Sequence, residues 1–347
     1  MRVISLFVAV AVTLLCSSFV ALCAEPPWRQ DTWGHYVHGG TYVCNSGSMS
    51  PNGEYLVFGS PRKGNGDIWR LHLKDSTLDQ LTDSVDFNSE PAFSPDGESI
   101  FYLREREGYT HIWRMDKNGK SHEQLTFGEV VDKLMDIAPN GNNLLISRFY
   151  YLKGAGRGLD AGTTMVYSIS DKKMVDEISR EDIGSARFFL DSDTLLFSSF
   201  GKDNAFGKYD MVSKKRNIWG KGWIECVSSN KKIVCIWQQA AGRDFIKRDL
   251  ALFDVDKQNA KELGIGMYPC FLGDSKIFFV QSSPRKACIY SLNGTTHEME
   301  LPWGVVTPPV VAAGNRGVLL RLRSPTDADR AGNIYLFNGA GIEKLTQ

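Results

Sequence analysis

The sequence lacks an excess of charge of either sign. Its 40 Lys and Arg residues balance its 40 Asp and Glu residues, so the formal net charge is +0. Binding to nucleic acid or to an anionic membrane surface draws on a basic surplus that releases counterions. Short basic runs such as Lys214-Lys215-Arg216 are typical of solvated hairpin tips. The composition therefore gives no support for a nucleic-acid partner.

The sequence also lacks the motifs of several enzyme classes. It contains no Gly-x-Ser-x-Gly nucleophile elbow, no P-loop and no dinucleotide-binding glycine pattern between a strand and a helix. Histidine is scarce, with six in the chain. His35 and His38 form a His-x-x-His in a glycine-rich segment, but no cysteine stands beside them, and no calcium loop of the alternating-Asp type occurs. We expect no cofactor and no metal ion.

Long apolar runs are missing except at the N-terminus. Arg2 is followed by an apolar run over residues 3–15, and small residues lie near Ala24. A positive start, an apolar stretch and small residues form a secretory signal pattern, so we expect cleavage near Ala24. An uncleaved anchor and a lipid on Cys23 are the alternatives. Cleavage would leave a periplasmic or secreted protein without a membrane span.

Cysteine is too scarce for a disulfide scaffold. Two of the seven cysteines fall in the expected signal, and an odd number remains, so at least one thiol stays free. Cys226 and Cys235 flank a predicted hairpin tip. They either face each other and could form a disulfide, or fill the core as small apolar side chains. Cys270 is expected to fill the core.

The sequence does contain a repeat. Residues 50–53, 94–97 and 138–141 read Ser-Pro-Asn-Gly, Ser-Pro-Asp-Gly and Ala-Pro-Asn-Gly, at equal spacing. Pro presets φ, Asn and Asp tolerate unusual backbone angles and Gly accepts positive φ, so these segments predict hairpin tips. The same position continues in degraded form at residues 190–193, 228–231, 272–275 and 313–316.

Apolar columns flank these tips. Before the turn we align Met49, Phe93, Ile137, Phe188, Cys226, Cys270 and Val311. After the turn we align Leu56, Ile100, Leu144, Leu195, Ile233, Ile277 and Val318. Apolar runs without polar alternation predict strands that are buried on both faces. A third strand with an aromatic residue and a polar fourth strand follow in the repeat, with no helix of consequence.

Four strands in each of seven units predict an all-β fold, a seven-bladed β-propeller of four-stranded antiparallel blades. The expected organisation is a signal peptide over residues 1–24, an N-terminal extension over 25–42 and the propeller over 43–347. The ring closes either by packing of the last unit on the first or through a clasping strand from residues 31–42.

The repeat resembles that of the TolB-like β-propeller family. The resemblance is clearest at Ser89–Gly97, followed by Ile112-Trp113 and Gln124-Leu125-Thr126, and it extends over essentially the whole mature chain. It implies an envelope or periplasmic protein that holds partner proteins at one mouth of the ring. TolB itself carries an N-terminal α/β domain before a six-bladed propeller. The short extension and seven units here differ from that plan, so the likeness concerns the fold.

The first strand of each blade lines the channel of a propeller, and function is therefore expected there. The candidate ligand-binding residues are Asn45, Glu90, Asp136, Arg187, Trp223, Glu225 and Tyr268. Mixed charge with two aromatic residues suits a protein or peptide partner in the envelope, or a glycan. A structural alternative is that Glu90 and Asp136 pair with Arg187 or cap backbone amides.

We therefore expect a binding scaffold, which is more consistent with the sequence than an enzyme. The alternative is a carbohydrate-active or hydrolytic enzyme that uses channel carboxylates. In that case Glu90 and Glu225 would act as a carboxylate pair for glycosidic cleavage.

Overall fold

The computed structural model describes residues 47–345 outside a set of short segments: 61–65, 152–161, 179–184, 200–203, 240–247, 283–284, 302–304, 313–317, 324–332 and 338–341. These residues belong to one compact unit over Gly39–Gln347. The expected signal peptide, the extension over 25–42 and Asn45 lie outside the described residues. No helix in the described part is long and apolar enough to cross a membrane.

All regular structure in the described residues is β-strand, and each strand pairs antiparallel with the next one along the chain within its sheet, except that β8 does not pair with β9. The first sheet contains β1 (Gly47–Met49), β2 (Tyr55–Ser60), β3 (Asp67–His72) and β4 (Leu78–Gln80). A larger sheet contains β5 (Phe87–Phe93), β6 (Ser99–Arg106), β7 (Tyr109–Asp116), β8 (Glu123–Gln124), β9 (Val130–Ile137), β10 (Asn143–Tyr150), β11 (Thr163–Ser168) and β12 (Lys173–Ile178).

Four further sheets follow in chain order, each with four strands. The first two contain β13 (Ser185–Phe189), β14 (Thr194–Ser198), β15 (Ala205–Asp210), β16 (Lys215–Lys221), β17 (Trp223–Val227), β18 (Ile233–Gln239), β19 (Arg248–Asp254) and β20 (Asn259–Ile265). The last two contain β21 (Met267–Leu272), β22 (Lys276–Ser282), β23 (Arg285–Ser291), β24 (Thr296–Glu300), β25 (Val305–Ala312), β26 (Val318–Arg323), β27 (Asn333–Phe337) and β28 (Ile342–Lys344).

The eight-stranded sheet consists of two four-stranded runs, β5–β8 and β9–β12. A single parallel bridge between Thr110 of β7 and Val131 of β9 joins the two runs. Apart from this bridge, each run has the same antiparallel order as the other sheets. The chain is therefore an all-β protein built from a repeated four-stranded antiparallel unit.

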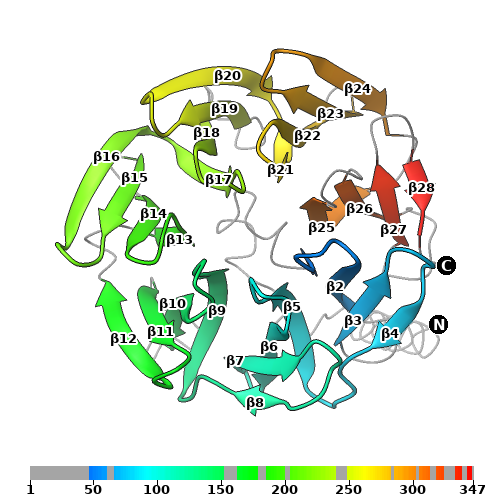
Figure 1. Ribbon diagram of the computed structural model, residues 1–347, viewed down its shortest axis with the longest axis vertical. Helices are drawn as coiled ribbons and strands as arrows, with labels where there is room; N and C mark the ends of the chain where they lie inside the picture. The colour runs from blue at the N-terminus through cyan, green and yellow to red at the C-terminus, as the bar shows by residue number, and fades with distance from the viewer. Residues whose placement is uncertain are drawn as a thin grey trace, which may run out of the picture. The chain divides into compact units, whose positions relative to one another are not determined.

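The core lies between neighbouring sheets. Each buried cluster takes its side chains from two four-stranded runs that follow one another in the chain. One further cluster joins the two ends of the array, because Leu56, Trp69 and Leu71 of the first sheet pack with Leu336 of the last. The first strands lie at the inner side of the sheets, and β25 contacts β1 (Figure 1). The apolar strands are thus buried on both faces, as the repeat predicts.

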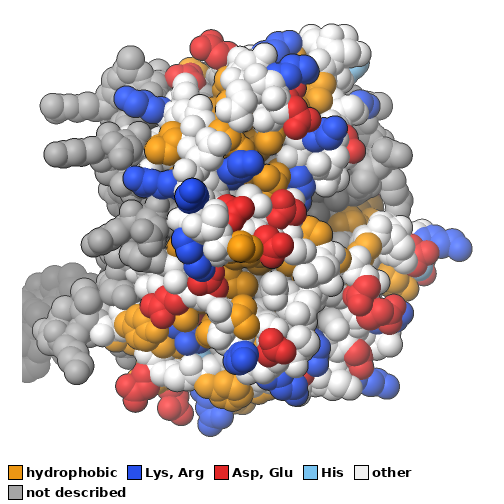
Figure 2. Space-filling view, turned by 60° about the vertical axis from the view of Figure 1, so that its left-hand side comes forward, with side chains coloured by type: hydrophobic (Ala, Val, Ile, Leu, Met, Phe, Trp, Pro, Cys, Tyr) orange, Lys and Arg blue, Asp and Glu red, His pale blue; other side chains and the backbone are white. Residues whose placement is uncertain are grey.

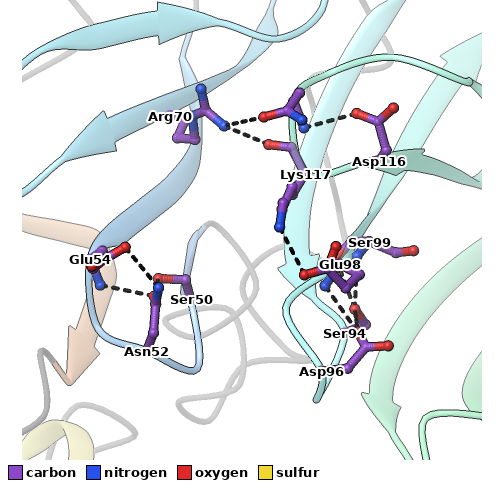
Figure 3. A network of polar contacts seen from close by, with 11 residues as sticks. Ser50, Asn52, Glu54, Arg70, Ser94, Asp96, Glu98, Ser99, Asp116 and Lys117 are labelled. Atoms are coloured by element: carbon purple, nitrogen blue, oxygen red, sulfur yellow. Dashed lines mark hydrogen bonds and ion pairs between the residues drawn. The ribbon is translucent and has the colours of Figure 1, made fainter.

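The predicted hairpin tips are present. Gly53, Gly97 and Gly141 have φ between +72° and +75°, and each donates its N–H to the carbonyl of the residue that opens its turn. Figure 3 shows two of these tips and the contacts between their sheets. Arg70 of β3 donates to the Lys117 carbonyl of the next sheet at 2.6 Å, and within that sheet the Lys117 ammonium contacts Glu98 at 2.8 Å. Polar contacts therefore support the apolar packing between these sheets.

The predicted column before the turn is correct in the first three units and wrong by one residue in the last four. Met49, Phe93 and Ile137 pair with the residues expected after the turn. The observed partners in the later units are Phe189↔Leu195, Val227↔Val234, Phe271↔Ile277 and Ala312↔Val318, in place of pairs with Phe188, Cys226, Cys270 and Val311. The turns before Leu195 and Ile277 are one residue shorter than the early tips, and the predicted tip at residues 313–316 lies outside the described residues. A one-residue shift exchanges the two faces of a strand.

Cys226 and Cys235 are direct partners across β17 and β18. Both thiols are buried, and both belong to the core cluster that also contains Leu250 and Phe271. Cys270 is buried in the neighbouring cluster. These cysteines therefore serve as core side chains in this structure.

Candidate functional site

A β-bulge recurs in the first strand of the sheets. The register against the second strand shifts inside β5, β9, β13, β17, β21 and β25. The shift occurs at Glu90-Pro91, Met135, Arg187, Glu225, Tyr268-Pro269 and Pro308-Pro309. Bulges bend a strand, redirect side chains and occur frequently beside functional sites. Four candidate residues, Glu90, Arg187, Glu225 and Tyr268, thus occupy one level of the repeat.

Two of these bulges contain backbone strain. Glu90 has φ of 50° and Tyr268 has φ of 55°, and each precedes a proline. Residues other than glycine adopt this left-handed region at a cost of about 1–3 kcal/mol, and such residues cluster at ligand-contacting sites. Both side chains are half-buried at the inner strands. The same strained conformation in two different sheets is therefore a recurring feature of the inner edge.

The bulge of β17 differs because its carboxylate is buried. Glu225 is 1% exposed, whereas Trp223 at the start of the strand is half-buried. Trp223 pairs in register with Trp237 of β18, and the two ring centroids are 5.3 Å apart. Glu225 is therefore less accessible to a ligand than the Trp223–Trp237 pair, which lies where β17 begins.

Asp136 has a structural role. Its carboxylate accepts the Phe189 N–H of the following sheet at 2.8 Å and lies 4.0 Å from the Lys231 ammonium. Burial raises the pKa of Asp136, while the Lys231 charge and the N–H groups of Phe189 and Ile137 oppose this shift. Of the alternatives that the sequence left open, amide capping holds for this residue. The Arg187 side chain lies outside the described part of the chain.

The N-terminal part of the chain matches a model of a known protein family. The family model described as the TolB beta propeller domain, PD40, matches residues 34–153. This segment, about a third of the chain, is therefore similar to the TolB beta propeller domain. No curated protein matches the sequence.

Solved structures with a similar fold align with more of the chain. TolB from Acinetobacter baumannii is 15% identical with a TM-score of 0.51, and the alignment covers 72% of this chain and 60% of that one. An oligogalacturonate lyase from Vibrio parahaemolyticus is 10% identical with a TM-score of 0.63, covering 85% and 89%. The propeller domain of the trilobed protease from Pyrococcus furiosus is 13% identical with a TM-score of 0.62, covering 89% and 97%. At these identities the likeness concerns the fold alone.

The TolB-like repeat also contains a polar pair in the inner half of the sheets that the sequence analysis does not find. Arg148 of β10 binds the carboxylate of Asp132 in β9 through two hydrogen bonds of 2.7 and 2.8 Å. Asp132 is fully buried and Arg148 is 12% exposed. Nδ1 of His111 in β7 is also buried and has no hydrogen-bond partner among the described residues. Burial lowers the pKa of His111, and the Asp132 charge opposes this shift.

The preceding four-stranded run carries an equivalent pair. Arg104 of β6 faces Asn88 of β5 in the same register position and donates to its amide oxygen at 3.0 Å. The guanidinium group also lies 4.1 Å above the Trp113 ring. A sequence signal could have found both pairs. In both runs an arginine lies four residues after the first apolar residue that follows the turn: Arg104 follows Ile100, and Arg148 follows Leu144.

Metal binding has no support among the described residues. No group of three or more His, Cys, Asp or Glu side chains in this part of the chain is arranged to hold a metal ion.

Proposed function

We propose that the chain is an exported, seven-bladed TolB-like propeller that acts as a binding scaffold in the periplasm or cell envelope. It engages a protein or peptide partner at one mouth of the ring. The signal pattern over residues 1–24 supports export.

The repeated unit supports the proposed blade count. Counting the runs β5–β8 and β9–β12 separately, because a single bridge joins them, gives seven four-stranded units. The buried clusters support the same number, since each joins two successive units and the last joins the final unit to the first. Stacking of like sheets into a ring covers the apolar faces that an open array would expose at its two ends.

The recurrent bulge at the inner strands is the observation that carries the binding proposal. It brings Glu90, Arg187, Glu225 and Tyr268 to one level of the repeat, on separate sheets. A ligand at the axis can therefore contact several sheets at once. The strained backbone of Glu90 and Tyr268 supports a functional reason for these positions, because residues strained in this way cluster at ligand-binding sites.

The chemistry of this level suits a peptide chain. Glu90 and Arg187 offer charges of both signs, and Tyr268 and Trp223 offer flat apolar surface with a polar edge. Tyrosine, tryptophan and arginine are the residues that contribute most of the affinity at protein interfaces. A folded partner with a projecting segment, or an extended peptide, fits this combination.

The experiment uses the full chain as bait in envelope extract from the producing organism. Glu90→Ala and Tyr268→Ala should each weaken recovery of a stoichiometric partner by about tenfold. Lys261→Ala, on the outer strand β20, is the matched control and should leave recovery unchanged. Equal recovery with all variants would contradict the proposed site. Turnover of a glycan that disappears in Glu90→Gln would replace the scaffold with the carbohydrate-active alternative.

Export is tested separately by intact mass. The proposal expects a mature chain that begins near Glu25 and fractionates with periplasmic or secreted proteins. A full-length chain in the cytoplasmic fraction would contradict this part.

A further inference from the structure

The structure points to a second interaction surface, on the outside of the four-stranded sheet β13–β16. We propose that the outer edge of β16 (Lys215–Lys221) binds an extended acidic segment of a partner protein by strand addition. This surface is separate from the inner-strand bulges, so the two proposals fail independently.

β16 is the last strand of its sheet. Among the described strands it pairs with β15 alone, and its first four residues are exposed. A terminal strand has a row of backbone N–H and C=O groups on its outer edge that can pair with an added strand. β16 has seven residues, with a register shift against β15 at Trp219, so its regular edge covers residues 215–218, whereas β8 of the second run has two residues in all.

The charge on this edge has one sign. β16 reads Lys-Arg-Asn-Ile-Trp-Gly-Lys and contains no acidic residue. The other outer strands differ: β12 contains Asp176 and Glu177, β20 contains Glu262, and β24 contains Glu298 and Glu300. An all-basic edge repels a second copy of itself and attracts an acidic strand. Complementary charge therefore favours an acidic occupant.

A hollow lies beside this edge. It has a volume of about 510 Å³ and is lined by Lys208, Asp210, Lys215, Arg216, Asn217 and Ile218. Three of these residues are basic and one is acidic. The Asp210 carboxylate is held by the N–H and hydroxyl of Ser213, and these bonds lower its pKa. The lining therefore keeps a net positive charge.

An apolar contact lies within the same strand. Ile218 is 49% exposed, and it follows Lys215, Arg216 and Asn217 in the strand. Figure 2 turns this side of the molecule toward the viewer, where blue Lys and Arg side chains and orange apolar side chains reach the surface. Lys215 and Asn217 lie on one face of the strand, and Arg216 and Ile218 lie on the other. An occupant that alternates acidic and apolar residues can thus place a carboxylate beside Lys215 and an apolar side chain beside Ile218.

The test uses a blocked eight-residue peptide that alternates Glu and Val, with a Lys-Val peptide as the probe control. Hydrogen exchange on the full chain should show that the Glu-Val peptide protects backbone amides within residues 215–221. The double variant Lys215→Glu/Arg216→Glu should weaken binding by at least about tenfold, because the basic edge that attracts the acidic peptide becomes acidic. Lys261→Glu on β20 is the matched control and should leave the affinity unchanged.

Three results would overturn the proposal. The first is binding of the Glu-Val peptide without protection of the β16 amides, because that indicates attraction of charges without strand pairing. The second is equal affinity for the wild type and the double variant. The third is self-association of the chain that the same double variant abolishes, which assigns the edge to a second copy. The double variant and the Lys261→Glu control must both unfold cooperatively at the urea midpoint of the wild type. Ile218→Thr, which keeps the charges of β16, should also weaken binding of the Glu-Val peptide.

Discussion

Asp136 of β9 accepts the backbone N–H of Phe189 in β13, across the boundary between two sheets. Ser48 of β1 accepts the Phe93 N–H of β5 in the same way, at 3.1 Å. A side chain on one first strand thus binds the backbone of the next. These contacts connect the inner strands directly and set the distance at which successive sheets meet.

The pKa of Asp136 gives a pH-dependent prediction. Its folded pKa is raised by burial, so its contribution to stability is fully present below the unfolded value of 3.8 and is lost as the pH rises through the folded value. The free energy of unfolding of the wild type, minus that of Asp136→Asn, should therefore fall between acidic and neutral pH. Urea titrations of both proteins at a series of pH values measure this difference. A constant difference would contradict the raised pKa.

Removing the partner of a buried charge should be costly. Arg148→Met leaves the fully buried Asp132 carboxylate without its two hydrogen bonds, and we expect a loss of about 3–5 kcal/mol in the free energy of unfolding. The double variant Asp132→Leu/Arg148→Met should recover most of that loss, because no isolated charge remains. Urea unfolding of the three proteins provides the comparison. A double variant that is as unstable as Arg148→Met would show that packing, rather than charge, dominates.

Gly207 should resist substitution because the outer strand approaches it closely. A Cβ atom at Gly207 would lie 2.0 Å from the Asn217 carbonyl oxygen, so Gly207→Ala must displace β16. We expect a loss of about 1–3 kcal/mol. Gly59→Ala is the matched control in a strand, since its Cβ would make ordinary contacts of 3.6 Å or more. Thermal unfolding should therefore distinguish the two, and equal costs would contradict the observed register.

The Cys288 thiol should react slowly in the folded protein. Burial raises its pKa to about 11, so only about a thousandth of it is thiolate at pH 8. Alkylation with iodoacetamide, followed by peptide mass spectrometry, should label Cys288 in urea and leave it almost unlabelled in buffer at pH 8. Rapid labelling without denaturant would place this thiol at the surface.

The fold could be predicted from the sequence because its determinants are local. The glycines at 53, 97 and 141 specify turns through their positive φ, and apolar runs without alternation specify strands that are buried on both faces. The register of the later sheets could not be predicted. The register depends on turns that are one residue shorter than the early ones. A degraded tip such as residues 190–193 does not indicate how long its turn is.

The candidate site was predictable only as a set of strands. The sequence assigns Glu90, Glu225 and Tyr268 to first strands, but the bulge that aligns them arises from hydrogen-bond register between strands. The role of Asp136 depends on a backbone group of another sheet. Arg148 escapes sequence analysis because it lies on a second strand, and its partner position holds Asn88 in one run and Asp132 in the next.

Closure of the array is the claim on which the proposed ring and its shared binding level depend. Leu71 of the first sheet and Leu336 of the last belong to one buried cluster. A double-mutant cycle with Leu71→Ala and Leu336→Ala, measured by urea unfolding, tests this packing most directly. We predict a coupling free energy of about 0.5–3 kcal/mol, as for residues that pack together. Additive losses, within about 0.3–0.5 kcal/mol, would mean that the two ends do not meet and would contradict the ring.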